Sequence, residues 1–128
     1  MGMLAGLLHD IGHGPFSHLF EDVIAKRCGL TFNHEAISAS IARKVLHELS
    51  LSTDEIENVL QLMHGTSMCC YGEIISNQRN GIDVDKMDYF IRDSMCCFGK
   101  PTVDVRVHRL FNSARLVQVE DSNKEEVM

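Results

Sequence analysis

Apolar and polar positions alternate along most of the chain with the period of an α-helix. After Pro15, apolar residues recur at intervals of three and four, at Phe16, Leu19, Phe20, Val23 and Ile24. This spacing places all five on one helix face. We expect that helix to begin at Pro15 and to end near Cys28-Gly29. Before it, the apolar segment 2–11 predicts a buried helix that ends at Gly12.

The rest of the chain carries further helix patterns with recognisable start and stop signals. Asn33 can cap a helix whose apolar positions are Ile37, Ile41, Val45 and Leu49. Ser52 and Glu55 form a capping-box pattern before an amphipathic helix that stops at Gly65. We expect a loop over 66–72. The last predicted helices span 72–79, 82–97 and 106–116, with a short strand over 115–119 as the alternative to the end of the last one.

These elements predict one all-α domain over residues 1–118 and a charged, frayed tail over 119–128. The chain has 128 residues, of which 45% are hydrophobic, which suits a globular domain with its own core. No apolar run approaches the ~20 residues that span a membrane, so we expect no membrane partner. A net charge of −6 argues against binding to a nucleic-acid backbone. The cysteines are odd in number and include vicinal pairs, which favours reduced, half-buried thiols in an intracellular protein.

The first candidate site is a short run in which His9-Asp10 is followed by His13 and His18. Imidazole and carboxylate can each give one atom to a cation, a mixture that suits zinc, manganese, iron or magnesium. His18 is expected in the first turn of the next helix, where free N–H groups favour anions. A lone histidine is usually structural, but this density of ligand-competent side chains favours phosphate chemistry with a bound cation.

A second candidate face lies on the helix predicted over 82–97. Asp85, Tyr89 and Asp93 recur at intervals of four and therefore share one side of that helix, with Lys86 at its edge. The alternative is a solvated face with ordinary Asp–Lys and Asp–Arg pairs. Asp83 and Asp88 fit that alternative better than Asp85 does.

The third candidate is His34, which Glu35 follows at the start of a predicted helix. The two can form a proton-transfer pair or simply belong to a capped helix end. His47, His64 and His108 have no such partners in the sequence, and we interpret them as structural.

Three segments in this order resemble the HD-domain phosphohydrolases. They are residues 4–18, Asn33-His34-Glu35 and residues 74–90. The resemblance is closest to the eukaryotic deoxynucleoside triphosphate (dNTP) triphosphohydrolases that join a sterile-alpha-motif domain to an HD domain. It implies an HD-domain-like helical bundle with a metal site between helices. It also implies a reaction in which a dNTP yields a deoxynucleoside and inorganic triphosphate.

The resemblance implies a cofactor, partners and a role for each motif residue. The cofactor is a divalent ion (Zn, Mn, Fe or Mg), and the partners are the dNTP substrate and further copies of the full-length parent, in the nucleus or cytoplasm. The residues that match metal ligands are His9, Asp10 and Asp85. Those that match the catalytic histidines around the triphosphate are His13, His18 and His34. Lys86 matches a phosphate contact, and Tyr89 and Asp93 match residues that face the deoxyribose. Arg109 matches an arginine of the family's nucleotide effector site, across a two-residue insertion.

The chain departs from the family pattern in two respects. The family's metal site has a further histidine upstream of the His-Asp pair, and none precedes His9 here. The family's long C-terminal region has no counterpart either. We therefore expect the middle part of a larger enzyme, with weakened metal binding and activity. The alternatives are another HD nucleotide phosphohydrolase or phosphodiesterase, which Tyr89 and Asp93 oppose, and a catalytically inactive nucleotide-binding remnant.

Overall fold

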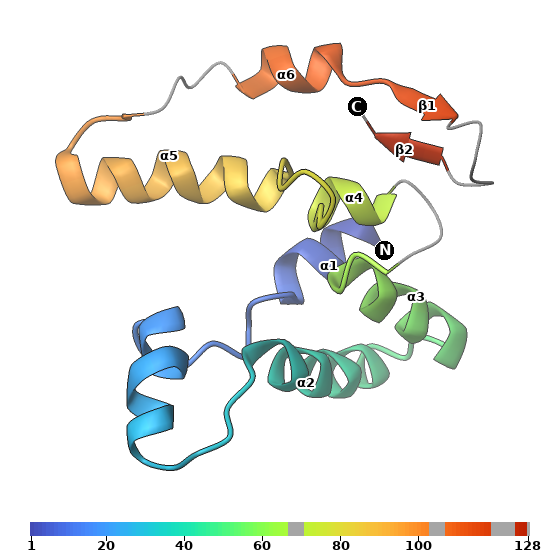
Figure 1. Cartoon of the computed structure of the whole chain (residues 1–128). Coiled ribbons are helices and arrows are strands. Elements are labelled where there is room, and N and C mark those ends of the chain that lie inside the picture. The colour runs from blue at the N-terminus through green and yellow to red at the C-terminus, as the bar shows by residue number, and fades with distance from the viewer. Residues whose placement is uncertain (67–70, 103–106, 119–124, 128) are drawn as a thin grey trace. The chain divides into compact units, whose positions relative to one another are not determined.

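The computed structural model describes residues 1–66, 71–102, 107–118 and 125–127 (Figure 1). The chain forms two compact units, Met1–His64 and Gly65–Met128. Among the described residues, no helix has the length and apolar character needed to cross a membrane. Cys28, Cys96 and Cys97 are free thiols as expected, but they are exposed rather than half-buried. The other two cysteines lie outside the described residues.

The first unit is a small helical bundle. Its elements are α1 (Gly2–Leu8), the π-helix η1 (Phe20–Ala25), α2 (His34–Glu48) and α3 (Thr53–Met63). The helices α1, α2 and α3 pack against one another. Their shared core is formed by small and aliphatic side chains, chiefly Ala5, Leu8, Ala42, Leu46, Ile56, Val59 and Leu60. The pattern of α3 predicted its packing face correctly. In α2 the buried residues are Ser38, Ala42 and Leu46, each one position after the predicted Ile37, Ile41 and Val45, and Leu49 is exposed. In α1, predicted to be buried, Met3 and Leu7 are exposed.

The helix starts in this unit follow from local chemistry, as predicted. The side chain of Asn33 accepts a hydrogen bond from the backbone N–H of Ala36 at 2.7 Å and caps α2. Ser52 and Glu55 form the complete capping box at the start of α3. Gly65 follows α3 with a φ of +63°, the left-handed conformation in which glycine carries no steric penalty.

The helix after Pro15 begins later than predicted. Phe16 and Ser17 have φ values of +68° and +51°, which a right-handed helix does not contain. Helical structure therefore starts at His18 instead of Pro15. His18 still lies in the first turn, as expected.

The apolar stripe of this segment is not the buried face that its spacing indicated. Phe16 lies before the first helical residue and therefore leaves the stripe. Beyond Leu19, the π-helical turns of η1 are wider than α-turns and shift the later side chains off the 3.6-residue period. Phe16 is 79% exposed and Leu19 is 55% exposed, whereas Ala25 is buried. Tertiary structure here overrides the sequence pattern.

The second unit contains the remaining helices and a short strand pair. Its elements are α4 (Tyr71–Ile75), α5 (Val84–Phe98), α6 (Val107–Ser113), β1 (Leu116–Gln118) and β2 (Glu125–Val127). The all-α class is confirmed, and the antiparallel pairing of β1 with β2 adds a minor sheet. The alternative strand interpretation of 115–119 was thus the better one. Of the tail predicted to be frayed, Glu125–Val127 is paired, while 119–124 and 128 lie outside the described residues.

Candidate active site

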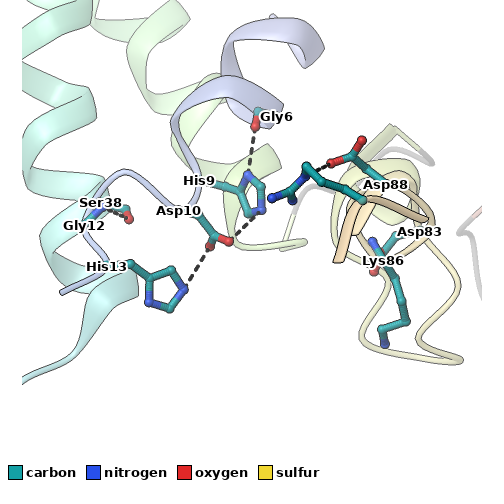
Figure 2. Close-up of polar contacts among 10 residues, drawn as sticks. Gly6, His9, Asp10, Gly12, His13, Ser38, Asp83, Lys86 and Asp88 are labelled. Carbon is teal, nitrogen blue, oxygen red and sulfur yellow. Dashed lines mark hydrogen bonds and ion pairs between the residues drawn. The ribbon is translucent and has the colours of Figure 1, made fainter. Parts of the chain in front are cut away.

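The His9-Asp10 pair lies at the C-terminal end of α1, where the chain leaves the helix (Figure 2). His9 Nδ1 is 2.9 Å from the carbonyl oxygen of Gly6. Donation from Nδ1–H orients the ring and leaves Nε2 with its lone pair. That Nε2 is 3.4 Å from one carboxylate oxygen of Asp10, and the other Asp10 oxygen is 3.7 Å from Nε2 of His13. Asp10 therefore bridges two imidazoles.

Gly12 anchors this loop to the start of α2. Its backbone N–H donates a buried hydrogen bond of 2.9 Å to the Ser38 hydroxyl (Figure 2). A Cβ on Gly12 would lie 2.4 Å from the Ser38 backbone nitrogen and 2.5 Å from the His34 carbonyl oxygen. Only glycine permits so close an approach of two backbones. The approach brings His13 beside His34, a proximity that sequence spacing does not show.

Three predicted histidines meet in this unit. The rings of His13 and His34 are stacked, with centroids 4.0 Å apart and planes 9° from parallel. His18 is edge-on to both, with centroid distances of 4.9 Å to His13 and 5.3 Å to His34. One nitrogen from each ring lies within 4.8 Å of the others. The structure thus gathers the three residues predicted to surround the triphosphate.

Glu21 is a member of this cluster that the sequence analysis missed. Its carboxylate oxygen Oε2 is 2.5 Å from Nδ1 of His34, and both side chains are largely buried. The sequence suggested Glu35 as the partner of His34, but Glu35 is exposed and the carboxylate beside the ring is that of Glu21. A sequence signal was present, because Glu21 follows His18 by three residues and so shares its helix face.

The electrostatic setting keeps His13 neutral. Burial lowers the pKa of His13, and the neighbouring His34 lowers it further, while Asp10 acts in the opposite direction. The imidazole is therefore unprotonated at neutral pH and can accept a hydrogen bond or bind a cation. Its Nδ1 is buried and has no hydrogen-bond partner within the described part of the chain.

The candidate residues of the second unit lie at the start of α5 and along it. Asp83 caps α5 by accepting a 2.8 Å hydrogen bond from the backbone N–H of Lys86 (Figure 2). The other Asp83 oxygen accepts from the backbone N–H of Asn77 at 3.0 Å. The buried Asn77 side chain in turn accepts from the backbone N–H groups of Arg79 and Asn80. This network fixes the turn from which Asp85 and Lys86 project.

Further along α5 lie Tyr89 and Asp93, the other two residues of the predicted face. Tyr89 is partly exposed, with its ring edge-on to Phe90 at a centroid distance of 4.9 Å. Asp93 is exposed, with an oxygen 3.8 Å from Nη1 of Arg92. Asp88 pairs with Arg92 at 3.1 Å, which is the solvated pair that the alternative interpretation assigned to it. The effector candidate Arg109 lies exposed on α6.

The predicted residues thus divide between the two units. The first holds His9, Asp10, His13, His18 and His34, together with Glu21. The second holds Asp85, Lys86, Tyr89, Asp93 and Arg109. The donor set at His9 and Asp10, one oriented imidazole beside one carboxylate, fits a divalent metal ion.

Comparison with known proteins identifies a family model and relatives that match most of this chain. A family model described as HD domain matches residues 3–93. An HD domain-containing protein of Acanthamoeba polyphaga mimivirus is 36% identical over 121 residues, which cover 89% of this chain and 24% of that protein. The deoxynucleoside triphosphate triphosphohydrolase SAMHD1 homolog of Dictyostelium discoideum is 37% identical over 108 residues, 78% of this chain and 21% of the relative.

Vertebrate deoxynucleoside triphosphate triphosphohydrolases also match this chain, at slightly lower identity. The deoxynucleoside triphosphate triphosphohydrolase SAMHD1 of Homo sapiens is 34% identical over 119 residues, covering 70% of this chain and 19% of that protein. The aligned part of the chain thus spans between 19% and 24% of these relatives' own lengths. The resemblance noted from the sequence motifs is confirmed.

Proposed function

This chain belongs to the HD-domain family, and we propose that it carries part of a metal-dependent phosphohydrolase that converts dNTPs to deoxynucleoside and inorganic triphosphate. The observation that carries the proposal is the histidine cluster beside the His9-Asp10 pair. It combines a cation-competent pair, three neighbouring imidazoles and a carboxylate that orients one of them. Similarity to dNTP triphosphohydrolases supports the choice of substrate class.

We assign the metal to His9, Asp10 and Asp85. When bound, a divalent ion would supply Lewis-acid stabilisation of the phosphoryl oxygens. The orientation of His9 by the Gly6 carbonyl is the support that metal-binding histidines generally have.

The remaining steps belong to the chain's own side chains. In the short contact with Glu21, Nδ1 of His34 donates to the carboxylate, so Nε2 presents its lone pair to the site. That nitrogen can then hold and deliver a proton to the leaving 5′-oxygen. His13 and His18 would contact the triphosphate oxygens. His13, which is neutral at neutral pH, accepts hydrogen bonds there or donates them through its one N–H.

The residues of α5 are assigned to substrate binding. Lys86 would neutralise a phosphate, while Tyr89 packs against the deoxyribose and Asp93 accepts a hydrogen bond from its hydroxyl group. Arg109 would contact the phosphates of an effector nucleotide. We further propose that the full-length protein acts as a homo-oligomer in the nucleus or cytoplasm.

The test is product analysis with purified protein, dGTP and each of Mn²⁺, Mg²⁺, Fe²⁺ and Zn²⁺, with matched Asp10→Ala and Asp54→Ala variants. We expect inorganic triphosphate, lost in Asp10→Ala and retained in Asp54→Ala, which is an exposed residue of α3. Release of pyrophosphate or orthophosphate would support another HD phosphohydrolase instead. Saturable dGTP binding without any product would support the inactive remnant.

A further inference from the structure

We propose that His13, His18 and His34 form a metal site of their own, which binds a borderline transition-metal ion such as Zn²⁺ through three imidazole nitrogens. The three residues lie wholly within the first unit and do not include the His9-Asp10 pair. The binding itself is independent of the proposed hydrolysis. Its consequence, inhibition by an ion that occupies the imidazole lone pairs, rests on the proposed function.

The first support is proximity. One nitrogen from each ring lies within 4.8 Å of the other two. Nitrogens bound to a tetrahedral zinc ion at ~2.0–2.1 Å are about 3.4 Å apart, and three histidines with an open fourth position are an established zinc ligand set. Because His13 and His34 are stacked nearly parallel, one ring must turn for both lone pairs to converge. His18 is exposed and free to follow.

The second support is the carboxylate behind His34. Glu21 Oε2 is 2.5 Å from Nδ1 of this histidine, so Nδ1 carries the proton and Nε2 presents its lone pair. A carboxylate that accepts the second ring N–H of a histidine is the usual outer support of a metal-bound imidazole. Glu35, which the sequence suggested as the partner of His34, is exposed, and the carboxylate beside Nδ1 is that of Glu21.

The third support is an unsatisfied nitrogen. Nδ1 of His13 is buried, and no hydrogen-bond partner for it is present among the residues that the structure describes. Buried polar atoms in proteins are almost always paired. A bound cation would satisfy this nitrogen, and the nearby carboxylates of Asp10 and Glu21 would balance part of its charge.

The test is metal binding by the chelator-stripped chain, measured with Co²⁺ by visible absorption and with Zn²⁺ by titration calorimetry. We expect His18→Ala and His34→Ala each to lose one bound equivalent. Glu21→Gln should keep that equivalent with roughly tenfold to hundredfold weaker affinity. His47→Ala is the matched control, because His47 is exposed at the other end of α2. His9→Ala should retain the equivalent, which separates this site from one at His9-Asp10.

Unchanged Zn²⁺ stoichiometry and affinity in His18→Ala would overturn the proposal, and loss of all bound metal in His9→Ala would do the same. His18 is exposed, so its substitution should leave the far-UV circular dichroism of the chain unchanged. Histidine-dependent Zn²⁺ binding without triphosphate release from dGTP would support this site and refute the proposed function. Triphosphate release without such binding would refute only the site.

Discussion

The histidine cluster of the first unit is held by contacts between residues far apart in sequence, whereas the candidate face of α5 follows from the helix period alone. In the first unit, Gly12 reaches Ser38 and Glu21 reaches His34. On α5, the exposed Asp88 makes a local ion pair with Arg92, one helical turn away. The difference indicates that the first unit specifies its site geometry by packing, while α5 presents side chains whose positions need only a well-capped helix.

The largest effect should come from removing the close approach at Gly12. In Gly12→Ala the new Cβ would meet backbone atoms of α2, which cannot move aside as a flexible side chain can. We expect the free energy of unfolding to fall by ~3 kcal/mol, measured by urea denaturation. The control is Gly6→Ala in α1, where a Cβ meets nothing within 4 Å. There we expect a gain of up to ~1 kcal/mol, since alanine is the better helix former.

The next effect concerns the hydrogen bond at the same contact. Ser38→Ala leaves the buried backbone N–H of Gly12 without its acceptor, which should cost ~2 kcal/mol. Ser40→Ala, at an exposed position of the same helix, should change stability by less than ~0.5 kcal/mol. Equal urea midpoints for the two variants would show that the contact at Gly12 does not fix the loop.

Features set by residues close together in sequence could be predicted, whereas features set by contacts between distant segments could not. Helix starts at Asn33 and Ser52 were predictable because each capping side chain accepts from a backbone N–H only three residues later. The His9-Asp10 run was recognisable because its chemistry is dense within one short segment. The stacking of His13 on His34 was not predictable, since it depends on a backbone approach between distant segments.

The errors have physical causes of the same kind. Glu21 was overlooked because its partner His34 is thirteen positions away, while Glu35 is adjacent in sequence and therefore more conspicuous. The helix after Pro15 was placed too early because left-handed residues at Phe16 and Ser17 leave no mark in an apolar pattern. On α5, by contrast, the pair of Asp88 with Arg92 followed from local spacing. Asp83 was expected on the same solvated face, but it lies just before the helix and caps it.

A smaller effect is expected at the cap of α5. Asp83→Ala removes the acceptor for the backbone N–H groups of Lys86 and Asn77 and should destabilise the first turn by about 1–2 kcal/mol. Asp88→Ala, which removes only an exposed pair with Arg92, should cost about 0.3–0.5 kcal/mol. Native-state hydrogen exchange of the α5 amides measures both. Equal protection factors in the two variants would contradict the view that α5 depends mainly on its cap.

The smallest effect tests strain in the turn between His13 and His18. Ser17 has a φ of +51°, a conformation that costs an L-residue about 1–2 kcal/mol and glycine almost nothing. Glycine also loses more backbone entropy on folding, so Ser17→Gly should gain only ~0.5 kcal/mol. Ser40→Gly, inside α2, should instead lose about 0.5 kcal/mol, because there glycine is the poorer helix former. Thermal unfolding should therefore show a higher Tm for Ser17→Gly and a lower Tm for Ser40→Gly. Shifts in the same direction would mean that the turn holding His18 beside the other two histidines is not strained, and that the cluster is ordered by ring contacts and the Glu21–His34 pair alone.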